Sequence, residues 1–304
     1  PNYSDLDKVL AYAVLGGIPH YLNQFSPDLS IEENIKQNIL TRGSVLYSEV
    51  EFLLHQELRE TPMYNSVIEA IATGSTKLNE ISQRAMVDDT AKTSVYLRNL
   101  IELGIVQREF SVDAKSKERT NTGRGIYRLT DNFFRFWYAY GFSNLSQLED
   151  GDVDGVYDYM VRPDLNRFAA LPFEDICQEF VRELQKRNAL PFRYSKMGRW
   201  LGRTTVRDQN TESGLRQAEI DLLAISQDAQ EYLVGECKFK HSPFSYSEYL
   251  DTTSKLSSWK KDSVFYYALF SASGFDQKIA DIARDTETLK LYNLENIVHQ
   301  ISPV

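Results

Sequence analysis

The feature that most constrains this sequence is the segment AEIDLLAISQDAQEYLVGECKFK, residues 218–240. Two apolar runs flank the polar turn QDAQ, a pattern typical of a β-hairpin. Three charged residues, Asp221, Glu236 and Lys238, lie inside these otherwise apolar runs. Because a buried charge is costly unless it is paired or binds a metal, these residues constrain both the fold and the function of this region.

The register of the hairpin predicts where these charges meet. In an antiparallel pair the numbers of facing residues have a constant sum, and a QDAQ turn makes Ser226 face Glu231. The same sum pairs Asp221 with Glu236, with side chains about 5 Å apart. Two carboxylates at that distance repel by about 3 kcal/mol at an effective dielectric near 20. A divalent cation, Mg²⁺ or Mn²⁺, would offset the repulsion, because such ions bind paired carboxylates together with water.

Lys238 adds a cation to this pair. It follows Glu236 by two residues, so strand periodicity places both on one face, whereas Cys237 is expected to point into the core. An ammonium group there can orient a metal-bound water and stabilise charge on a phosphate. Alternatively, Glu236 and Lys238 form a surface ion pair while Asp221 faces water. The predicted pairing also depends on the length of the turn, because a change of one residue there would undo the register.

Length and composition indicate a multidomain globular chain. A length of 304 residues suggests two or three domains. We expect no membrane partner, since no apolar run approaches the roughly 20 residues of a bilayer span. Two cysteines exclude a disulfide framework or a zinc cluster, and a cytoplasmic location fits. The net charge of -9 argues against generic polyanion binding but allows a local basic face.

Residues 1–58 are expected to be helical. The run LDKVLAYAVLGGIPHYLNQF has apolar residues at helical spacing, and Ser30 with Glu33 forms a capping-box pattern. Because the chain opens with Pro1 inside a helical pattern, we expect it to be part of a longer protein.

Residues 59–130 show the order of a winged helix-turn-helix. Three helical segments, the third capped by Asp88 or Asp89, precede the strand-like runs IVQREFS and GIYRLT. In such a domain the third helix can enter the major groove of DNA, while the loop between the strands, the wing, contacts phosphates. On the third helix we expect the inward-facing residues to be Val95, Leu97, Leu100, Ile101 and Leu103.

The expected DNA contacts are cations on two segments. They are Lys92 and Arg98, with Thr93, as outward donors on the third helix, and Lys115, Lys117, Arg119 and Arg124 in the wing. These side chains suit phosphate oxygens. The alternative is that the domain packs against another protein domain and its charged loop is merely solvated.

The remaining residues predict an aromatic connector and an α/β domain. The connector, residues 131–165, contains DNFFRFWYAY, whose aromatic rings must be buried as core. In residues 166–304 an amphipathic helix with Pro172 in its first turn precedes three strands near 192–201, 219–226 and 231–239. A helix, a strand, a helix and a short strand follow. This order predicts a mixed sheet covered by helices.

The charged residues of this last domain resemble the PD-(D/E)xK nuclease superfamily. Its pattern has an acid on a first helix, Asp on a second strand and Glu-x-Lys on a third, here Glu174, Asp221, Glu236 and Lys238. The resemblance implies a restriction-endonuclease-like αβββαβ fold. Asp221 and Glu236 would hold Mg²⁺ or Mn²⁺, Lys238 would position the attacking water, and Glu174 would support a ligand or a second metal. Glu174 has a simpler explanation too, because an acid in a first helical turn favours the macrodipole.

Two arginines near residue 201 are further candidates for contact with phosphate. Arg199 and Arg203 can contact phosphate, but we expect both to be exposed residues at a strand end. The four histidines are scattered and show no metal-ligand spacing.

Most of the chain also resembles the C-terminal half of archaeal-type AAA+ ATPases. The motifs LGGIPHYL, YRLTDNFFRFWY, FE, EIDLLA and ECKFK occur in that order around the winged helix. The resemblance makes residues 1–58 a helical lid remnant, followed by the winged helix, the connector and a nuclease-like domain at 166–304. The ATPase domain would be a partner in the longer parent. No GxxxxGK[ST] loop occurs in the sequence, so we expect no ATPase activity from this chain alone.

Two functions are compatible with the sequence. The first is a DNA-binding, Mg²⁺-dependent endonuclease that hydrolyses phosphodiesters with an activated water. The second is a non-catalytic regulatory or interaction half of the ATPase, because some members of the superfamily keep the fold without activity. The second function is favoured if Glu236 and Lys238 are fully exposed and lie more than about 8 Å from Asp221, which is too far to share a metal.

Overall fold

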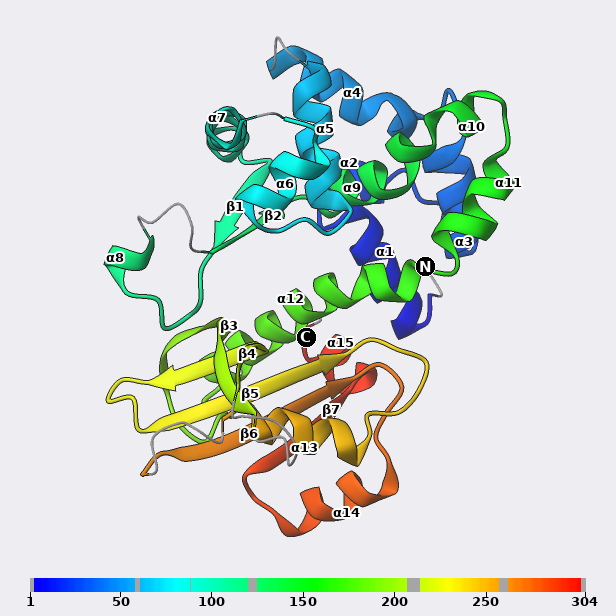
Figure 1. Cartoon of the computed structure of the whole chain (residues 1–304). Coiled ribbons are helices and arrows are strands. Elements are labelled where there is room, and N and C mark those ends of the chain that lie inside the picture. Colours follow the sequence, from blue (N-terminus) through cyan, green and yellow to red (C-terminus); the bar gives the residue numbers. More distant parts are fainter. Residues whose placement is uncertain are drawn as a thin grey trace. The chain divides into compact units, whose positions relative to one another are not determined.

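The computed structural model describes residues 3–57, 61–87, 89–119, 125–206, 214–256 and 262–301 (Figure 1). The chain divides into two compact units. The first comprises residues 1–109 and 120–169, and the second comprises residues 110–119 and 170–304. The first is mainly helical, whereas the second is built on a five-stranded mixed sheet. Among the described helices, none combines the length and apolar character that crossing a bilayer requires.

The first unit opens with helices, as the sequence predicts. At one helix start, the Ser30 hydroxyl accepts the N–H of Glu33, and the Glu33 carboxylate accepts the N–H of Ser30 at 2.8 Å. The predicted capping box is therefore confirmed. The elements are α1 (Asp5–Leu15), α2 (Pro19–Leu22), α3 (Ile31–Asn34), the π-helix η1 (Ile35–Leu40) and α4 (Val45–Glu57).

Three helices and a hairpin follow in the predicted order. Asp89 caps the third helix by accepting the N–H of Ala91 at 2.8 Å. The two strands are antiparallel, with Val106 facing Leu129. The elements are α5 (Thr61–Ala72), α6 (Leu78–Arg84), α7 (Thr90–Glu102), β1 (Val106–Glu109) and β2 (Ile126–Leu129).

The inward face of α7 is narrower than predicted. Its buried stripe follows the three- and four-residue spacing of one helix face and consists of Thr93, Leu97 and Leu100. Thr93 is therefore not an outward donor, and its hydroxyl bonds that of Ser82 at 3.1 Å. The predicted burial is wrong for three apolar residues that lie off this stripe and are exposed, Val95, Ile101 and Leu103.

The aromatic connector forms core, as predicted. Asp131 caps its first helix by accepting the N–H of Phe133 at 2.7 Å. The buried rings include Phe133, Phe134, Phe136, Trp137 and Tyr140. The elements are α9 (Asn132–Phe136), the π-helix η2 (Trp137–Gly141), the 3₁₀ helix η3 (Phe142–Asn144), α10 (Leu145–Glu149), α11 (Val153–Val156) and the π-helix η4 (Tyr157–Val161).

Helix α12 (Leu165–Lys186) begins earlier than predicted, so Pro172 lies inside it. A proline there leaves the carbonyl four residues earlier, that of Phe168, without its helical N–H donor. The Arg135 guanidinium donates to this carbonyl at 2.5 Å and stacks on the Phe168 ring at 3.8 Å. Because Arg135 supplies the missing donor from outside the helix, the helix can continue through Pro172, and the start predicted at Pro172 is too late. Glu174 is consequently not in a first turn, and the macrodipole explanation for it is wrong.

The second unit contains the predicted mixed sheet. Its strands are β3 (Tyr194–Val206), β4 (Gly214–Ser226), β5 (Glu231–Lys238), β6 (Val264–Ser271) and β7 (Leu289–Asn293), paired in that order. The first three strands are antiparallel, and β5, β6 and β7 are parallel. The described helices of this unit besides α12 are α8 (Ser116–Arg119), α13 (Tyr246–Ser254), α14 (Gln277–Asp285) and α15 (Leu294–Ile301).

Helices cover both faces of the sheet (Figure 1). On one face, Phe173 of α12 packs on Phe239, with ring centroids 5.2 Å apart. On the other, Tyr249 of α13 packs on Tyr267 of β6 at 5.7 Å. Because side chains alternate along a strand, Cys237 faces α12 with Phe239, whereas its two neighbours on β5 face the side of α13.

The segment Phe110–Arg119, which follows β1, packs on the outer edge of β3. The N–H of Val112 donates to the carbonyl of Arg199 at 2.9 Å. Asp113 accepts the indole N–H of Trp200 at 3.0 Å, and Val112 is buried in the same apolar cluster as Trp200. The segment thus covers an edge strand whose backbone groups would otherwise be open to pairing.

Candidate active site

The predicted register of the β4–β5 hairpin is confirmed. Leu222 faces Gly235 and Ile225 faces Tyr232, pairs with the constant sum derived from the turn. A Cβ on Gly235 would lie 2.9 Å from the Leu222 Cβ, so a side chain here would force the strands apart. The hairpin therefore brings its carboxylates close together just beyond the Leu222–Gly235 pair.

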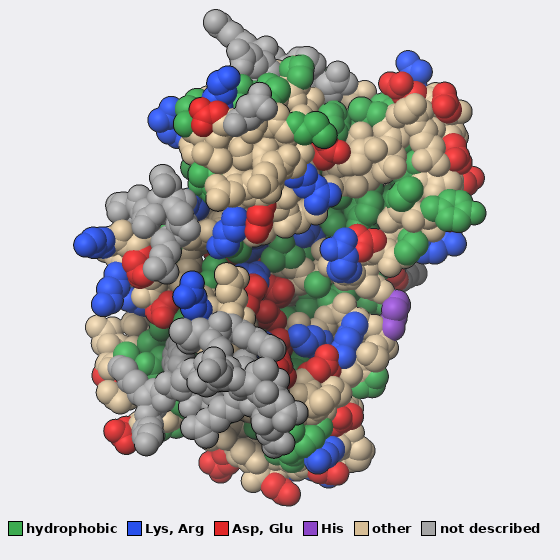
Figure 2. Space-filling model, viewed as in Figure 1, with side chains coloured by type: hydrophobic (Ala, Val, Ile, Leu, Met, Phe, Trp, Pro, Cys, Tyr) green, Lys and Arg blue, Asp and Glu red, His purple; other side chains and the backbone are tan. Residues whose placement is uncertain are grey.

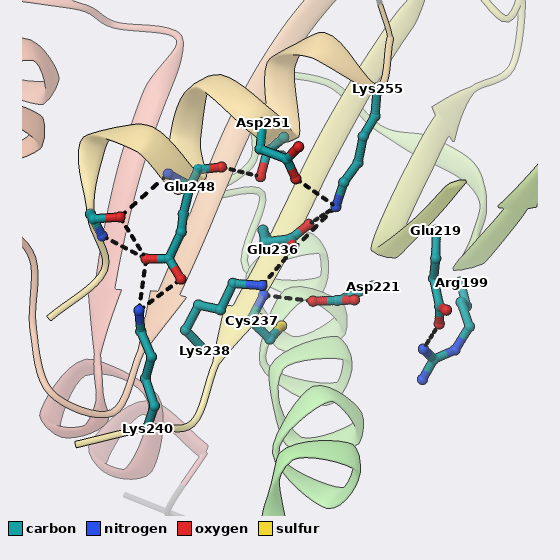
Figure 3. A network of polar contacts seen from close by, with 12 residues as sticks. Arg199, Glu219, Asp221, Glu236, Cys237, Lys238, Lys240, Glu248, Asp251 and Lys255 are labelled. Carbon is teal, nitrogen blue, oxygen red and sulfur yellow. Dashed lines mark hydrogen bonds and ion pairs between the residues drawn. The ribbon is translucent and has the colours of Figure 1, made fainter. Parts of the chain in front are cut away.

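Asp221 lies in a β-bulge that the sequence did not reveal. A register shift between residues 198 and 200 sets one residue of β3, Arg199, against two residues of β4, Asp221 and Leu222. Such a bulge redirects a side chain and interrupts pairing. Here the Asp221 Oδ2 accepts the backbone N–H of Cys237 at 2.8 Å (Figure 3). The carboxylate is thereby fixed against β5.

Glu236 is a buried carboxylate held by two lysines (Figure 3). It is 5% exposed. The Lys238 Nζ lies 2.7 Å from its Oε1, and the Lys255 Nζ lies 3.0 Å from its Oε2 and 3.2 Å from its Oε1. The interpretation as a surface ion pair on a solvent-facing strand is therefore wrong.

Lys255 is a site residue that the sequence analysis missed. It caps the C-terminal end of α13, and only 17% of its side chain is exposed. Strand register predicts contacts between paired strands, but the position of Lys255 depends on how a helix packs over the sheet. No sequence signal marked it. The second missed residue is Gln178 of α12, whose side-chain amide donates to the Asp221 carbonyl at 3.2 Å.

The electrostatics follow from this burial. Desolvation, with repulsion from Glu236 as the next cause, raises the pKa of Asp221 to about 6, although the Cys237 N–H and Lys238 oppose the shift. Burial by itself would lower the pKa of Lys238, but attraction to Glu236 outweighs it, and the pKa lies above its ordinary value. The carboxylate pair therefore favours a proton or a cation.

Glu174 and Arg199 form a second buried charge cluster. Arg199 is 5% exposed and pairs with Glu174 of α12 and Glu219 of β4. Its predicted exposure is wrong, because α12 covers its side of the sheet. Arg203 is exposed as predicted. The structure thus gives Glu174 a buried cation as its partner.

The predicted DNA-binding residues occur on two separate segments. Lys92 and Arg98 are exposed on α7 of the first unit. On Phe110–Arg119 of the second unit the exposed cations are Lys115, Lys117 and Arg119. Arg124 lies outside the described residues. On the face shown in Figure 2, basic and acidic side chains are interspersed.

The residues present fit a small divalent cation held by two carboxylates. Asp221 and Glu236 come from neighbouring strands, and Mg²⁺ typically uses one or two carboxylates while water or substrate phosphate completes its shell. A cage of three or more His, Cys, Asp or Glu side chains does not occur among the described residues. The ammonium groups of Lys238 and Lys255, which contact the Glu236 carboxylate, would compete with such a cation for its oxygens.

Comparisons with known proteins give a partial resemblance. Residues 137–251 match the family DUF234, described as archaeal and bacterial proteins of unknown function. This match includes Asp221, Glu236 and Lys238 but ends before Lys255. An uncharacterized protein of Methanocaldococcus jannaschii is 33% identical over 235 residues, which are 77% of this chain and 48% of that protein. The chain therefore spans about half the length of this relative.

Two solved structures also show a limited likeness. AF1548, a protein of unknown function, is 16% identical over 42% of this chain and 65% of its own, with a TM-score of 0.26. VC1899 from Vibrio cholerae is 12% identical over 98% of this chain and 55% of its own, with a TM-score of 0.33. At these TM-scores neither structure assigns a fold.

Proposed function

We propose that this chain is a metal-dependent, nuclease-like and DNA-binding region of a longer protein, and that it hydrolyses phosphodiesters with an activated water. One observation carries the proposal. A bulge on β4 and the adjacent strand β5 bring the half-buried Asp221 and the buried Glu236 together with Lys238. Buried like charges without a functional reason are rare, and perturbed carboxylates cluster at functional sites. The helix–three-strand–helix–strand order of the second unit agrees with a restriction-endonuclease-like fold.

Each residue has a separate role in the proposed chemistry. Asp221 and Glu236 would bind Mg²⁺ or Mn²⁺ through their carboxylates, and the Cys237 N–H keeps Asp221 oriented for this. A bound divalent cation makes a water ligand more acidic and neutralises phosphate charge. Lys238 would donate a hydrogen bond to the attacking water and stabilise the charge that develops on the phosphate oxygens. Glu174 would act indirectly, by fixing Arg199 on β3 beside the bulge.

The rest of the chain would bring the site to DNA. Helices α5, α6 and α7 with the β1–β2 hairpin support a winged helix that contacts DNA through Lys92 and Arg98. The motifs shared with archaeal-type AAA+ ATPases support a parent protein with an ATPase domain. The M. jannaschii relative is long enough for such a domain, since this chain covers 48% of it.

A non-catalytic interaction role is the second candidate. The observation that favours it is the pairing of Glu236 with two lysines, Lys238 and Lys255. In that case the cluster is a buried structural ion network, and the winged helix supplies the function.

Metal binding separates the two candidates. Titration calorimetry with Mn²⁺ should detect binding to the native chain that is lost in Asp221→Asn. Asp228→Asn, in the turn of the same hairpin, is the matched control and should bind normally. Equal affinity in the native chain and Asp221→Asn would reject the assigned site.

A further inference from the structure

We propose that Lys255 is a built-in counter-cation of Glu236 that a divalent cation must displace, so that the metal binds tightly only together with an anionic substrate. This inference rests on the proposed function and names how the same site is regulated. Lys255 lies outside the charged motif of β4 and β5, at the C-terminal end of α13.

The geometry places Lys255 in direct competition with a metal. Its ammonium group lies within hydrogen-bond distance of both oxygens of Glu236, at 3.0 and 3.2 Å (Figure 3). A cation bound by Glu236 needs at least one of these oxygens. Lys238 contacts one oxygen, Oε1, so Lys255 is the group that occupies Oε2.

The charges of the cluster balance without a metal. Asp221 and Glu236 contribute -2 when both are ionised, and Lys238 and Lys255 contribute +2, so the sum is zero. A divalent cation alone would raise the sum to +2 in a half-buried site, which is unfavourable. Once Lys255 has left Glu236, the sum falls to +1, and a phosphodiester carrying -1 would restore neutrality.

Lys255 also has a second position available to it. Asp251, one turn earlier on α13, lies with its Oδ2 4.0 Å from the Lys255 Nζ, and its side chain is 74% exposed. The ammonium group can therefore leave Glu236 and remain paired at the helix surface. Lys240, by contrast, pairs with Glu248 and makes a natural control at the same side of the sheet.

The experiment compares Mn²⁺ affinity by titration calorimetry in the native chain, Lys255→Met, Lys255→Arg and Lys240→Met. Removing one charge about 4 Å from a divalent ion should tighten Mn²⁺ binding at least tenfold, even at a water-like dielectric. Lys255→Arg and Lys240→Met should bind as the native chain does. Thermal unfolding checks that each variant is folded, and Lys255→Gln replaces Lys255→Met if the latter is not.

The outcomes separate this inference from the proposed function. If the native chain and Lys255→Met bind Mn²⁺ equally, or if Lys255→Arg binds as tightly as Lys255→Met, the competition is refuted while the metal site stands. If none of the proteins binds Mn²⁺, with or without DNA, the metal site itself is refuted.

A second readout tests the coupling to an anion. Cation and DNA must raise each other's affinity by the same factor. The factor by which Ca²⁺ tightens binding of a fluorescent DNA duplex should be smaller in Lys255→Met than in the native chain, by about tenfold. An equal factor in the two proteins would refute the coupling.

Discussion

At the scale of single residues, Asp221 is the group whose chemistry the fold changes most. Its carboxylate is desolvated beside Glu236 and has only the Cys237 N–H and nearby cations to stabilise its charge. Its proton is therefore held more firmly in the folded protein than in the unfolded chain. The same proton competes with a metal, so cation affinity should rise as the pH increases through about 6.

This pKa shift predicts a pH-dependent stability. The folded pKa of about 6 lies above the ordinary value of 3.8, so the folded state binds more protons in that window. The free energy of unfolding should then fall as the pH rises from about 4 to about 6, by roughly 2–3 kcal/mol. Asp221→Asn should lack this part of the dependence. Urea unfolding of both proteins across the window measures it, and parallel curves would contradict the shift.

At the scale of elements, the site depends on close approach of β4 and β5. Gly235 permits this approach, because an added Cβ would lie 2.9 Å from Leu222. Gly235→Ala should therefore destabilise the chain by about 1–3 kcal/mol, the usual cost of overpacking. Gly198→Ala in β3 is the control, since its Cβ would meet Val112 at an ordinary 3.7 Å. Chemical denaturation measures the free energy of unfolding of both variants. Equal losses of stability would show that the contact between Gly235 and Leu222 does not determine the cost.

Helix α12 depends on a contact from outside the helix. Arg135 supplies the donor that Pro172 cannot give to the Phe168 carbonyl. Arg135→Met should cost about 1–3 kcal/mol, because it leaves a carbonyl without this partner. Adding Pro172→Ala restores an N–H and should recover part of the loss. A double-mutant cycle measures the coupling, and strictly additive effects would refute this account.

The elements also show how far sequence reasoning reaches. The β4–β5 register follows from a local turn and a period of two, so the approach of Asp221 to Glu236 was predictable, but the paired residues end at Leu222 and Gly235, one position before them. The bulge opposite Arg199 was not, since it requires knowledge of the partner strand. Long-range contacts likewise decide the start of α12 and the place of Lys255. Burial of Thr93 depends on which side of α7 packs against α6, which the pattern of apolar residues left open.

At the scale of the whole molecule, DNA binding should depend on salt. Lys92 and Arg98 are exposed on α7, where phosphate contacts are expected. Each phosphate contact adds about 0.9 to the slope of log affinity against log salt. Lys92→Ala and Arg98→Ala should each reduce the slope by about one. Fluorescence anisotropy at several salt concentrations tests this, with the exposed Arg182→Ala on α12 as control. If the salt dependence of DNA affinity is unchanged in Lys92→Ala and Arg98→Ala, α7 does not contact DNA phosphates.

The central claim is that Asp221, Glu236 and Lys238 form a hydrolytic site. The most direct test is cleavage of single-stranded, duplex and branched DNA with Mg²⁺ or Mn²⁺ by the native chain, Lys238→Ala and the control Lys240→Ala. We predict metal-dependent cleavage by the native chain and the control, and a loss of at least about a hundredfold in Lys238→Ala, as expected when a transition-state charge loses its partner. Cleavage that survives in Lys238→Ala, or DNA binding without cleavage by any of the three proteins, would contradict the claim.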